Sequence, residues 1–516
     1  MRVEVDRDWR RLECHLSFAT TDRCLGDWVF RKLDSGSHIS YLCFFYGGDL
    51  LSIVVMWFRR DLRLYDNRAL MRAAELANGS TVHAIFAFSD KLVEVSSVRR
   101  VSYLSFALRA LDDSVGGRLN LTHGDPANDV VAFAISVGAT HVLATREYTP
   151  LGRSRDERVR TLLSDAGITF EVGDSPYLIS PGKIARQAKG WYRVFTPFYR
   201  AVLAHGYDQP LGPASVGFAT PRVRDDAALF LLGREPLFDV SMFPGDEVQA
   251  MARLVEFCQS SMGSYNTGRN NSAIDGTSRL SPALRFGILH PRQVADVAGS
   301  HLGGDDLIRQ VIWRDFFAQV VFFAPKTTWS NFDTRFDAIV QDDPTQGIAK
   351  VRFEAWKAGR TGYPIVDAGM RQLNELGWLH NRARMITASF LVKDLHISWR
   401  HGAQYFMDQL LDGDIASNNH SWQWVAGSGT DSSPYFRIFN PILQSKKFDP
   451  SGEYIRRWVP ELRALPTKFV HEPWGAKDLG LLEPSGYADR IVSHEDERRD
   501  SLDRYHMISG SQDPRP

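Results

Sequence analysis

The chain has 516 residues, of which 44% are hydrophobic and 12% aromatic, and its 61 acidic side chains balance its 61 basic side chains. This length predicts two to four domains, and the composition is that of an ordinary globular protein, which argues against a disordered chain, a collagen-like repeat and a disulfide scaffold. Because the net charge is zero, binding to nucleic acid would depend on a local basic patch.

The cysteine pattern indicates neither a disulfide framework nor a zinc site. Four cysteines are scattered without a CxxC pair, at Cys14, Cys24, Cys43 and Cys258. We therefore expect a reducing, cytoplasmic location. The apolar stretch 41–58 is interrupted by Gly47, Gly48 and Asp49, so we do not expect it to span a membrane.

Regular patterns begin abruptly after residue 50. Residues 1–50 have no sustained period of 2 or 3.6, and we expect them to lie outside the native product. Apolar and β-branched runs then predict strands at Leu51–Trp57, Val82–Phe88, Leu119–Thr122, His141–Thr145 and Ile168–Val172. Helical patterns separate them at Asn67–Leu76, Val98–Leu111, Ala127–Val137 and Ser154–Ala166. This alternation predicts a parallel sheet and an α/β domain over residues 51–177.

The second half of the chain has a different pattern. Residues 178–247 contain several Pro and Gly pairs, which predicts a linker wrapped on the surface. Helical periodicity then dominates, at Glu247–Ser260, Pro291–Ala298, Asp305–Phe323, Tyr363–Leu376, Asn381–Leu395 and Gly402–Leu410. We therefore predict a larger, all-helical domain over residues 248–516.

Hydroxyl side chains cluster just before Pro282, in the segment 277–281. Hydroxyl and backbone N–H groups at a helix start can hold an anion, although a plain helix N-cap would explain the same residues.

Two arginines, Arg382 and Arg384, occur in an otherwise apolar helical segment and need partners if they are buried. Asp412 and Asp414 are the candidate carboxylates, and an exposed acidic turn is the alternative.

The segment 418–424 reads Asn-Asn-His-Ser-Trp-Gln-Trp. On a helix, Trp422 and Trp424 would lie a little over half a turn apart, so one could face a buried ligand while the other packs elsewhere. Core packing is the commoner role of tryptophan. Basic and aromatic residues interleave further on, at Arg437, Lys446, Lys447, Phe448, Tyr454, Arg456, Arg457 and Trp458. That pattern is typical of a surface along a phosphate backbone, or of a solvated charged face.

Taken together, these segments resemble the photolyase/cryptochrome family, and most closely its class I cyclobutane pyrimidine dimer photolyases. The resemblance is carried by Trp57–Leu64, Tyr192–Phe198, Thr277–Ser281, Trp313–Phe316, Thr361–Arg371, Asn381–Met385, Asp412–Asp414 and Arg437–Pro441. These motifs occur in the family's order and span residues 53–506. The resemblance implies a DNA repair flavoenzyme with a Rossmann-like antenna domain followed by an all-helical FAD-binding domain.

The resemblance also implies an FAD site. Its phosphates would be held by Tyr265, Thr277, Ser278, Arg279, Leu280 and Ser281. Arg384 would pair with Asp412 beside the flavin, and Gly413 and Asp414 would lie near it. Asn418 would face flavin N5, where photolyases have Asn and plant-type cryptochromes have Asp.

Damaged DNA is the implied substrate. Positions that contact a flipped-out cyclobutane dimer match Gln310, Trp313, Asn381, Met385 and Gln444, and DNA-contacting positions match Arg269 and Arg314. Light-excited reduced flavin would pass one electron to the dimer, which opens the ring and returns the electron.

Gln310 departs from this pattern, because class I enzymes have Glu there and the (6-4) photolyases are similar in having Gln. The catalytic histidine of the (6-4) enzymes is missing, since only His380 precedes Asn381. We therefore expect cyclobutane dimer repair, with (6-4) photoproduct repair and a cryptochrome-like blue-light photoreceptor as alternatives.

Family members also reduce oxidised flavin through three tryptophans, the first two of which match Trp422 and Trp399. No tryptophan occurs between Phe336 and Ala355, where the third is expected. Trp329 or Tyr363 could replace it, and we expect slow photoreduction.

A second, antenna chromophore is implied near residues 146–156, and the sequence does not distinguish methenyltetrahydrofolate from 8-hydroxy-deazaflavin. We expect a monomer whose partner is DNA containing pyrimidine dimers, with no membrane partner.

Overall fold

The structure is a computed structural model of the chain that describes residues 27–35, 38–46, 52–185, 190–431, 437–481 and 486–509. It divides into two compact units, residues 1–52 and residues 53–516. In the first unit, strands β1 (Asp27–Ser35) and β2 (His38–Tyr46) pair antiparallel, with Ser35 opposite His38. The sequence showed no sustained period here, but both segments are rich in the aromatic and β-branched residues that favour strands.

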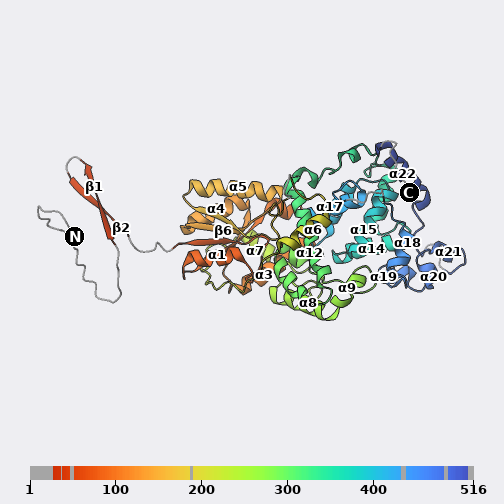
Figure 1. The fold of residues 1–516 in the computed structure, drawn as a ribbon, viewed down its shortest axis with the longest axis horizontal. Coiled ribbons are helices and arrows are strands. Elements are labelled where there is room, and N and C mark those ends of the chain that lie inside the picture. The colour runs from red at the N-terminus through yellow and green to blue at the C-terminus, as the bar shows by residue number, and fades with distance from the viewer. Residues whose placement is uncertain are drawn as a thin grey trace. The chain divides into compact units, whose positions relative to one another are not determined.

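The second unit begins with a five-stranded parallel sheet of order β5-β4-β3-β6-β7 (Figure 1). Its strands are β3 (Val54–Trp57), β4 (Val82–Ser89), β5 (Leu119–Gly124), β6 (His141–Thr145) and β7 (Thr169–Gly173). Each predicted strand is therefore present within a few residues of its predicted bounds. The central strand β3 is fully buried, as its continuous apolar run predicts for a sheet covered on both faces.

Helices cover both faces of this sheet. The helices are α1 (Arg68–Ala77), α2 (Asp90–Glu94), α3 (Val98–Ser114), α4 (Pro126–Val137) and α5 (Pro150–Asp165). Helices α1 and α3 pack with Val54 and Met56 on one face, whereas α4 and α5 pack with Val55 and Trp57 on the other (Figure 1). The alternation of side chains along β3 produces this two-sided packing.

The segment 178–247, expected to be a linker on the surface, contains two helices, α6 (Phe195–His205) and α7 (Asp226–Leu232). Phe195, Phe198 and Val202 lie on one helical stripe and are buried, and α6 packs on α12. The segment therefore packs on both parts of the unit, since α7 contacts α3 and β5 while α6 contacts α12.

The remainder is helical, as predicted. Its helices are α8 (Glu247–Ser260), α9 (Tyr265–Gly268), α10 (Ser281–Phe286), α11 (Pro291–Gly299), α12 (Gly304–Phe323), α13 (Gly347–Ala358), α14 (Pro364–Leu376), α15 (Asn381–Ser389), α16 (Trp399–Gln409), α17 (Ile415–Ala426), α18 (Pro441–Phe448), α19 (Glu453–Trp458), α20 (Thr467–Val470), α21 (Trp474–Lys477) and α22 (His494–Ser509). The predicted helix Asn381–Leu395 is instead α15 followed by a π-helical turn, η4 (Phe390–Asp394).

A single hydrophobic core joins the α/β part to the helical part, because residues of β3, α3, α6, α8, α11 and α12 belong to one buried cluster. The loop after β3 approaches α10 so closely that a Cβ on Gly287 would lie 1.9 Å from the carbonyl oxygen of Arg60. Among the described residues, no helix is both long enough and apolar enough to cross a membrane.

Candidate functional site

Arg384 and Asp412 form the ion pair expected from the sequence. Arg384 Nη2 lies 2.8 Å from Asp412 Oδ2, and Arg384 Nε donates to the carbonyl oxygen of Leu379 at 2.8 Å. The second carboxylate oxygen, Asp412 Oδ1, is buried and has no hydrogen-bond partner among the described residues. A buried acceptor without a donor is costly, so this oxygen fits a bound group that carries an N–H or O–H.

His380 provides an unsatisfied donor beside this ion pair. Its Nδ1 accepts the backbone N–H of Arg382 and caps α15, so the ring proton is on Nε2, which is buried and has no partner among the described residues. Burial, reinforced by the charges of Arg382 and Arg384, lowers the pKa of His380 to about 4. The imidazole is therefore neutral at pH 7 and carries one unsatisfied N–H, in the residue next to Leu379, whose carbonyl oxygen accepts from Arg384.

The predicted phosphate loop lies against α9. Gly276 and Gly268 are so close that a Cβ on Gly276 would lie 2.6 Å from the carbonyl oxygen of Gly268. This contact brings the segment 277–281 next to the helix of Tyr265, which is buried against Phe257.

Arg279 has a left-handed backbone, with φ of 56°, which a non-glycine residue adopts only where the surroundings hold it. Its side chain pairs with Asp275 at 3.0 Å and its guanidinium lies over the ring of Trp378.

Asp414 pairs with residues that the sequence analysis did not consider. Arg60 Nη2 lies 2.9 Å from its Oδ2 and Arg285 Nε lies 3.9 Å away, while its Oδ1 caps α17 at the N–H of Ser417. Burial alone would raise the pKa of Asp414, but the charges of Arg60, Arg285 and Arg314 hold it below the ordinary value.

Arg382, for which Asp414 was a candidate partner, instead donates to Asn270 Oδ1 at 2.7 Å and lies over the ring of Phe448. An ion pair was therefore predictable for one of the two arginines, but the partner of the other was not.

Asn418 and Trp422 lie one turn apart on the same face of α17. The Asn418 amide nitrogen donates to Ala403 O and to Asn419 Oδ1, which fixes the orientation of the amide. Its Oδ1 receives no hydrogen bond from the described residues, so it is the atom that can accept one. His420 points elsewhere, since its ring packs on Phe317.

Trp422 is buried and packs on α16, where Gly402 makes room for it: a Cβ there would lie 2.3 Å from the indole. Its ring contacts are with Phe406, at 4.9 Å between centroids, and with Trp356, at 6.3 Å. Trp356 in turn contacts Tyr405 at 5.7 Å. Trp399 is buried and donates its indole N–H to Asn331 Oδ1 at 2.8 Å. Among the described residues, Trp356 is therefore the tryptophan in ring contact with Trp422, and Trp399 lies on the neighbouring helix α16.

The two predicted replacements for the third tryptophan differ in their exposure to solvent. Tyr363 is buried against Phe390 and donates its hydroxyl to the carbonyl oxygen of Val492. Trp329 is 40% exposed, and its carbonyl oxygen accepts a hydrogen bond from Arg400.

The residues predicted to contact a lesion come from three helices. Asn381 Nδ2 lies 3.7 Å from Met385 Sδ, so both share one face of α15. Gln444 lies on α18, which packs on α15, and Gln310 and Trp313 lie on α12. The Trp313 ring is stacked on Phe195, with centroids 3.6 Å apart.

A cationic group borders the α15 end of this set. Arg382 and Lys447 both lie over the ring of Phe448. Burial lowers the pKa of Arg382, and the charge of nearby Arg269 lowers it further. Arg314, the other predicted DNA contact, donates to the carbonyl oxygens of Pro176 and Leu284 at 2.6 and 3.0 Å. Arg314 therefore links the α/β part to α10.

The charged groups of the predicted antenna region are paired with one another. Arg155 lies 3.2 Å from Glu147 and 3.3 Å from Asp156, and Asp156 also pairs with Arg59. Although burial opposes it, the charges of Arg155 and Arg59 lower the pKa of Glu147 to about 2. No side chain of this cluster identifies a particular chromophore.

The comparisons with known proteins agree with this geometry. Residues 54–215 match the family profile "DNA photolyase", and residues 307–507 match "FAD binding domain of DNA photolyase". The chain is 36% identical over 479 residues to a deoxyribodipyrimidine photo-lyase of Vibrio cholerae, and the match covers 88% of this chain and all of that protein.

Two solved structures are similar throughout. The crystal structure of a bacterial class III photolyase from Agrobacterium tumefaciens has a TM-score of 0.82 at 36% identity, covering 90% of this chain and 98% of that one. An archaeal photolyase from Sulfolobus tokodaii with two FAD molecules has a TM-score of 0.75 at 31% identity, covering 88% and 99%. The chain therefore belongs to the photolyase/cryptochrome family.

Proposed function

We propose that this protein is a deoxyribodipyrimidine photo-lyase that binds FAD and splits cyclobutane pyrimidine dimers in DNA under light. One observation supports the proposal most strongly. Within the described part of the chain, the buried acceptor Asp412 Oδ1 and the buried donor His380 Nε2 have no partners, and α15 carries both Arg384 and the Asn381–Met385 face. A flavin site and a lesion site would thus share one helix.

The residues present fit a flavin. A flavin ring carries both N–H and carbonyl groups, which complement the unsatisfied Asp412 and His380 atoms, and the positive charges of Arg384 and Arg279 suit its anionic phosphates and reduced ring. Asn418 would present its amide oxygen to the ring edge, and a neutral amide neither carries charge nor gives up a proton readily. When bound and reduced, FAD supplies one electron to the dimer on absorbing light.

The chain's share of the reaction is to bind, orient and exclude water. The Asn381–Met385 face, Gln444, Trp313 and Gln310 would surround a flipped-out dimer, whose damaged stacking makes it easier to extrude than a normal base pair. Arg269, Arg382 and Lys447 would hold the DNA backbone beside it, because guanidinium and ammonium groups neutralise phosphates.

Gln310 bears on the choice of substrate. Its Nε2 donates weakly to Asp306 O at 3.3 Å, so the side chain can turn toward a lesion, where it offers a donor and an acceptor but no charge. We assign the cyclobutane dimer, and (6-4) repair is the outcome that would contradict the assignment. We also propose a cytoplasmic monomer, with a second chromophore of unassigned type.

Survival of ultraviolet-irradiated bacteria that lack a photolyase tests this function. Expression of the full chain should raise survival under blue light and leave it unchanged in the dark. A protein that purifies with flavin and yet gives no light-dependent survival would be a photoreceptor instead of a repair enzyme. The Asp412→Asn variant, expected to lose flavin, is the matched control.

A further inference from the structure

His396 follows the π-helical turn η4 and lies deep in the helical part. Its backbone φ is 53°, a left-handed conformation that costs free energy in a non-glycine residue and persists only where the surroundings hold it. Its side chain is only 3% exposed. π-Helical turns and strained residues are often found at functional sites.

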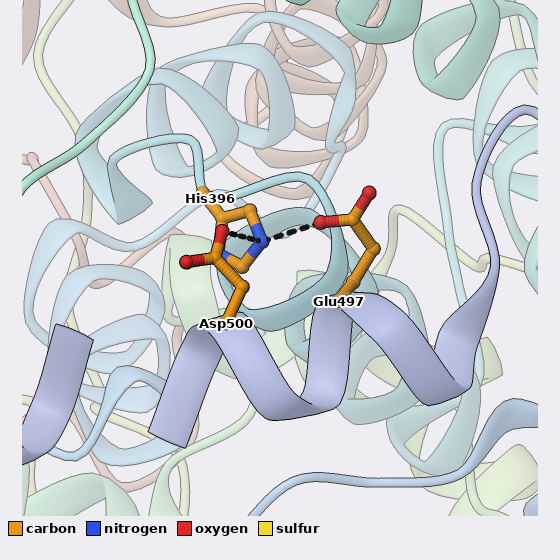
Figure 2. Close-up of side chains that lie close together, drawn as sticks. All are labelled: His396, Glu497 and Asp500. Carbon is orange, nitrogen blue, oxygen red and sulfur yellow. Dashed lines mark hydrogen bonds and ion pairs between the residues drawn. The ribbon is translucent and has the colours of Figure 1, made fainter. Parts of the chain in front are cut away.

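Two carboxylates of α22 converge on the same ring nitrogen of His396, as Figure 2 shows. Glu497 Oε2 lies 2.7 Å and Asp500 Oδ2 lies 3.2 Å from His396 Nε2. Glu497 and Asp500 are three residues apart and therefore share one face of α22. One ligand atom from each of the three residues lies within 4.8 Å of the others.

One proton does not satisfy this arrangement well. An N–H on Nε2 can be shared between two anionic oxygens only as a bent, weakened pair of bonds. A divalent cation at the same place would be bound by all three atoms at once. Zinc binds imidazole nitrogen and carboxylate oxygen at about 2.0–2.2 Å in tetrahedral geometry, so three ligand atoms that lie within 4.8 Å of one another can reach one ion.

We propose that His396, Glu497 and Asp500 form a binding site for Zn²⁺ or a similar divalent transition-metal ion, with water as the fourth ligand. Imidazole and carboxylate together favour such ions over Ca²⁺ and Mg²⁺, which take oxygen ligands. Asp500 is 45% exposed on its side chain and gives an ion access from solvent.

The surrounding charges are compatible with a cation. Arg504 donates to Asp500 Oδ2, the proposed ligand oxygen, at 2.9 Å from Nη2 and 3.1 Å from Nε, and it donates to Asp342 Oδ1 at 3.0 Å. Arg352 lies 3.5 Å from Glu497 Oε1, the oxygen that does not pair with His396. Three carboxylates thus face two guanidinium groups, and one negative charge remains. The arginines orient the carboxylates as outer-shell groups commonly do in metal sites. Burial lowers the pKa of His396, which favours the neutral, metal-binding form.

A metal here would fasten the C-terminal helix to the segment that leads into Trp399. His396 lies three residues before Trp399, while both carboxylates belong to α22. A second link joins the same elements, because His494 Nδ1 lies 2.5 Å from Asp394 Oδ1. The ion would therefore stabilise α22 against local unfolding, independently of the proposed repair activity.

Calorimetric titration of the chelator-treated full chain with ZnCl₂ tests the site. The parent should bind one more equivalent of Zn²⁺ than His396→Gln and Asp500→Asn, and amide hydrogen exchange in α22 should slow with Zn²⁺ in the parent only. His506→Gln removes an exposed imidazole from the same helix and should behave like the parent.

Affinity should also fall as the pH is lowered, because protons compete with the metal for the imidazole and the carboxylates. If His396→Gln is poorly folded, the Zn²⁺ titration of Asp500→Asn is sufficient to test the site, because the Asp500 side chain is half exposed. Equal Zn²⁺ stoichiometry in parent and Asp500→Asn, or no binding by the parent, would overturn the proposal and leave a hydrogen-bonded ion cluster.

Discussion

Arg60 Nη2 lies 2.9 Å from Asp414 Oδ2, which ties the loop after β3 to the first turn of α17. Both side chains are almost entirely buried, with exposures of 11% and 10%. Because α17 carries Asn418 and Trp422, this pair makes the α/β part a support for the proposed flavin site.

Replacing Arg60 by Met should destabilise the protein by about 3–5 kcal/mol, because it leaves the charge of Asp414 buried and partly unpaired. Urea unfolding at pH 7 measures the change. Lys446→Met, which breaks an exposed pair with Glu472, is the control and should cost about 0–1 kcal/mol. Equal effects of the two substitutions would show that the Arg60 pair does not support α17.

Arg384→Ala should lower the flavin content of the purified protein, because Asp412 would lose its ion-pair partner and repel a reduced flavin. The ratio of flavin to protein absorbance measures this. Arg371→Ala, which breaks an ion pair with Glu461 elsewhere, should retain the parent ratio. Full flavin content in Arg384→Ala would contradict the assigned role of the pair.

Met385→Ala should weaken binding to dimer-containing DNA much more than binding to undamaged DNA, since Met385 belongs to the proposed lesion face. Arg269→Ala should weaken both and reduce the slope of log affinity against log salt by about 1. Filter binding at several salt concentrations distinguishes the two effects. A uniform loss for Met385→Ala would place that side chain outside the lesion site.

The ring contacts of Trp422 predict how photoreduction proceeds in the absence of a third tryptophan. Trp356→Phe should slow photoreduction because Trp356 contacts Trp422 directly, and Trp399→Phe tests the route expected from the sequence. Transient absorption of the oxidised protein measures both. Repair by chemically reduced enzyme should be largely unaffected in either variant. Photoreduction that is fast in both variants would exclude both routes.

Asp315 should make stability depend on pH. It is buried and accepts the N–H of Ile179 at 2.8 Å, and burial raises its pKa to about 7. An acid whose pKa is raised by folding adds stability below its unfolded value, and that stability is lost as the pH rises toward 7. In the parent, the free energy of unfolding should therefore fall as the pH rises from about 4 to about 7, and in Asp315→Asn this fall should be absent. Parallel stability curves for parent and variant would contradict this.

The sequence predicted the parallel sheet well because buried strands such as Val54–Trp57 are continuous apolar runs. It predicted no helix at Phe195–His205, because the stripe of Phe195, Phe198 and Val202 lies in a segment rich in Pro and Gly. Long-range pairing was hardest to predict. Arg60 and Asp414 are 354 residues apart, so only the packed structure brings them together.

At the candidate site, the Arg384–Asp412 pair was implied by the resemblance to the family, and the structure contains it. The partners of Arg382 were not, since Asn270 and Phe448 carry no opposite charge. The His396 cluster has no sequence signal, because Glu497 lies about 100 residues away on a helix whose register relative to η4 depends on packing.

The most direct test is the repair of a defined oligonucleotide containing one thymine cyclobutane dimer by the purified, flavin-loaded, chemically reduced protein under blue light. Restored thymine absorbance in the light, with none in the dark and none on a (6-4) photoproduct, is the predicted result. Gln310→Glu should raise the yield if Gln limits contact with the dimer. Repair of the (6-4) photoproduct alone, or of neither lesion, would contradict the assignment.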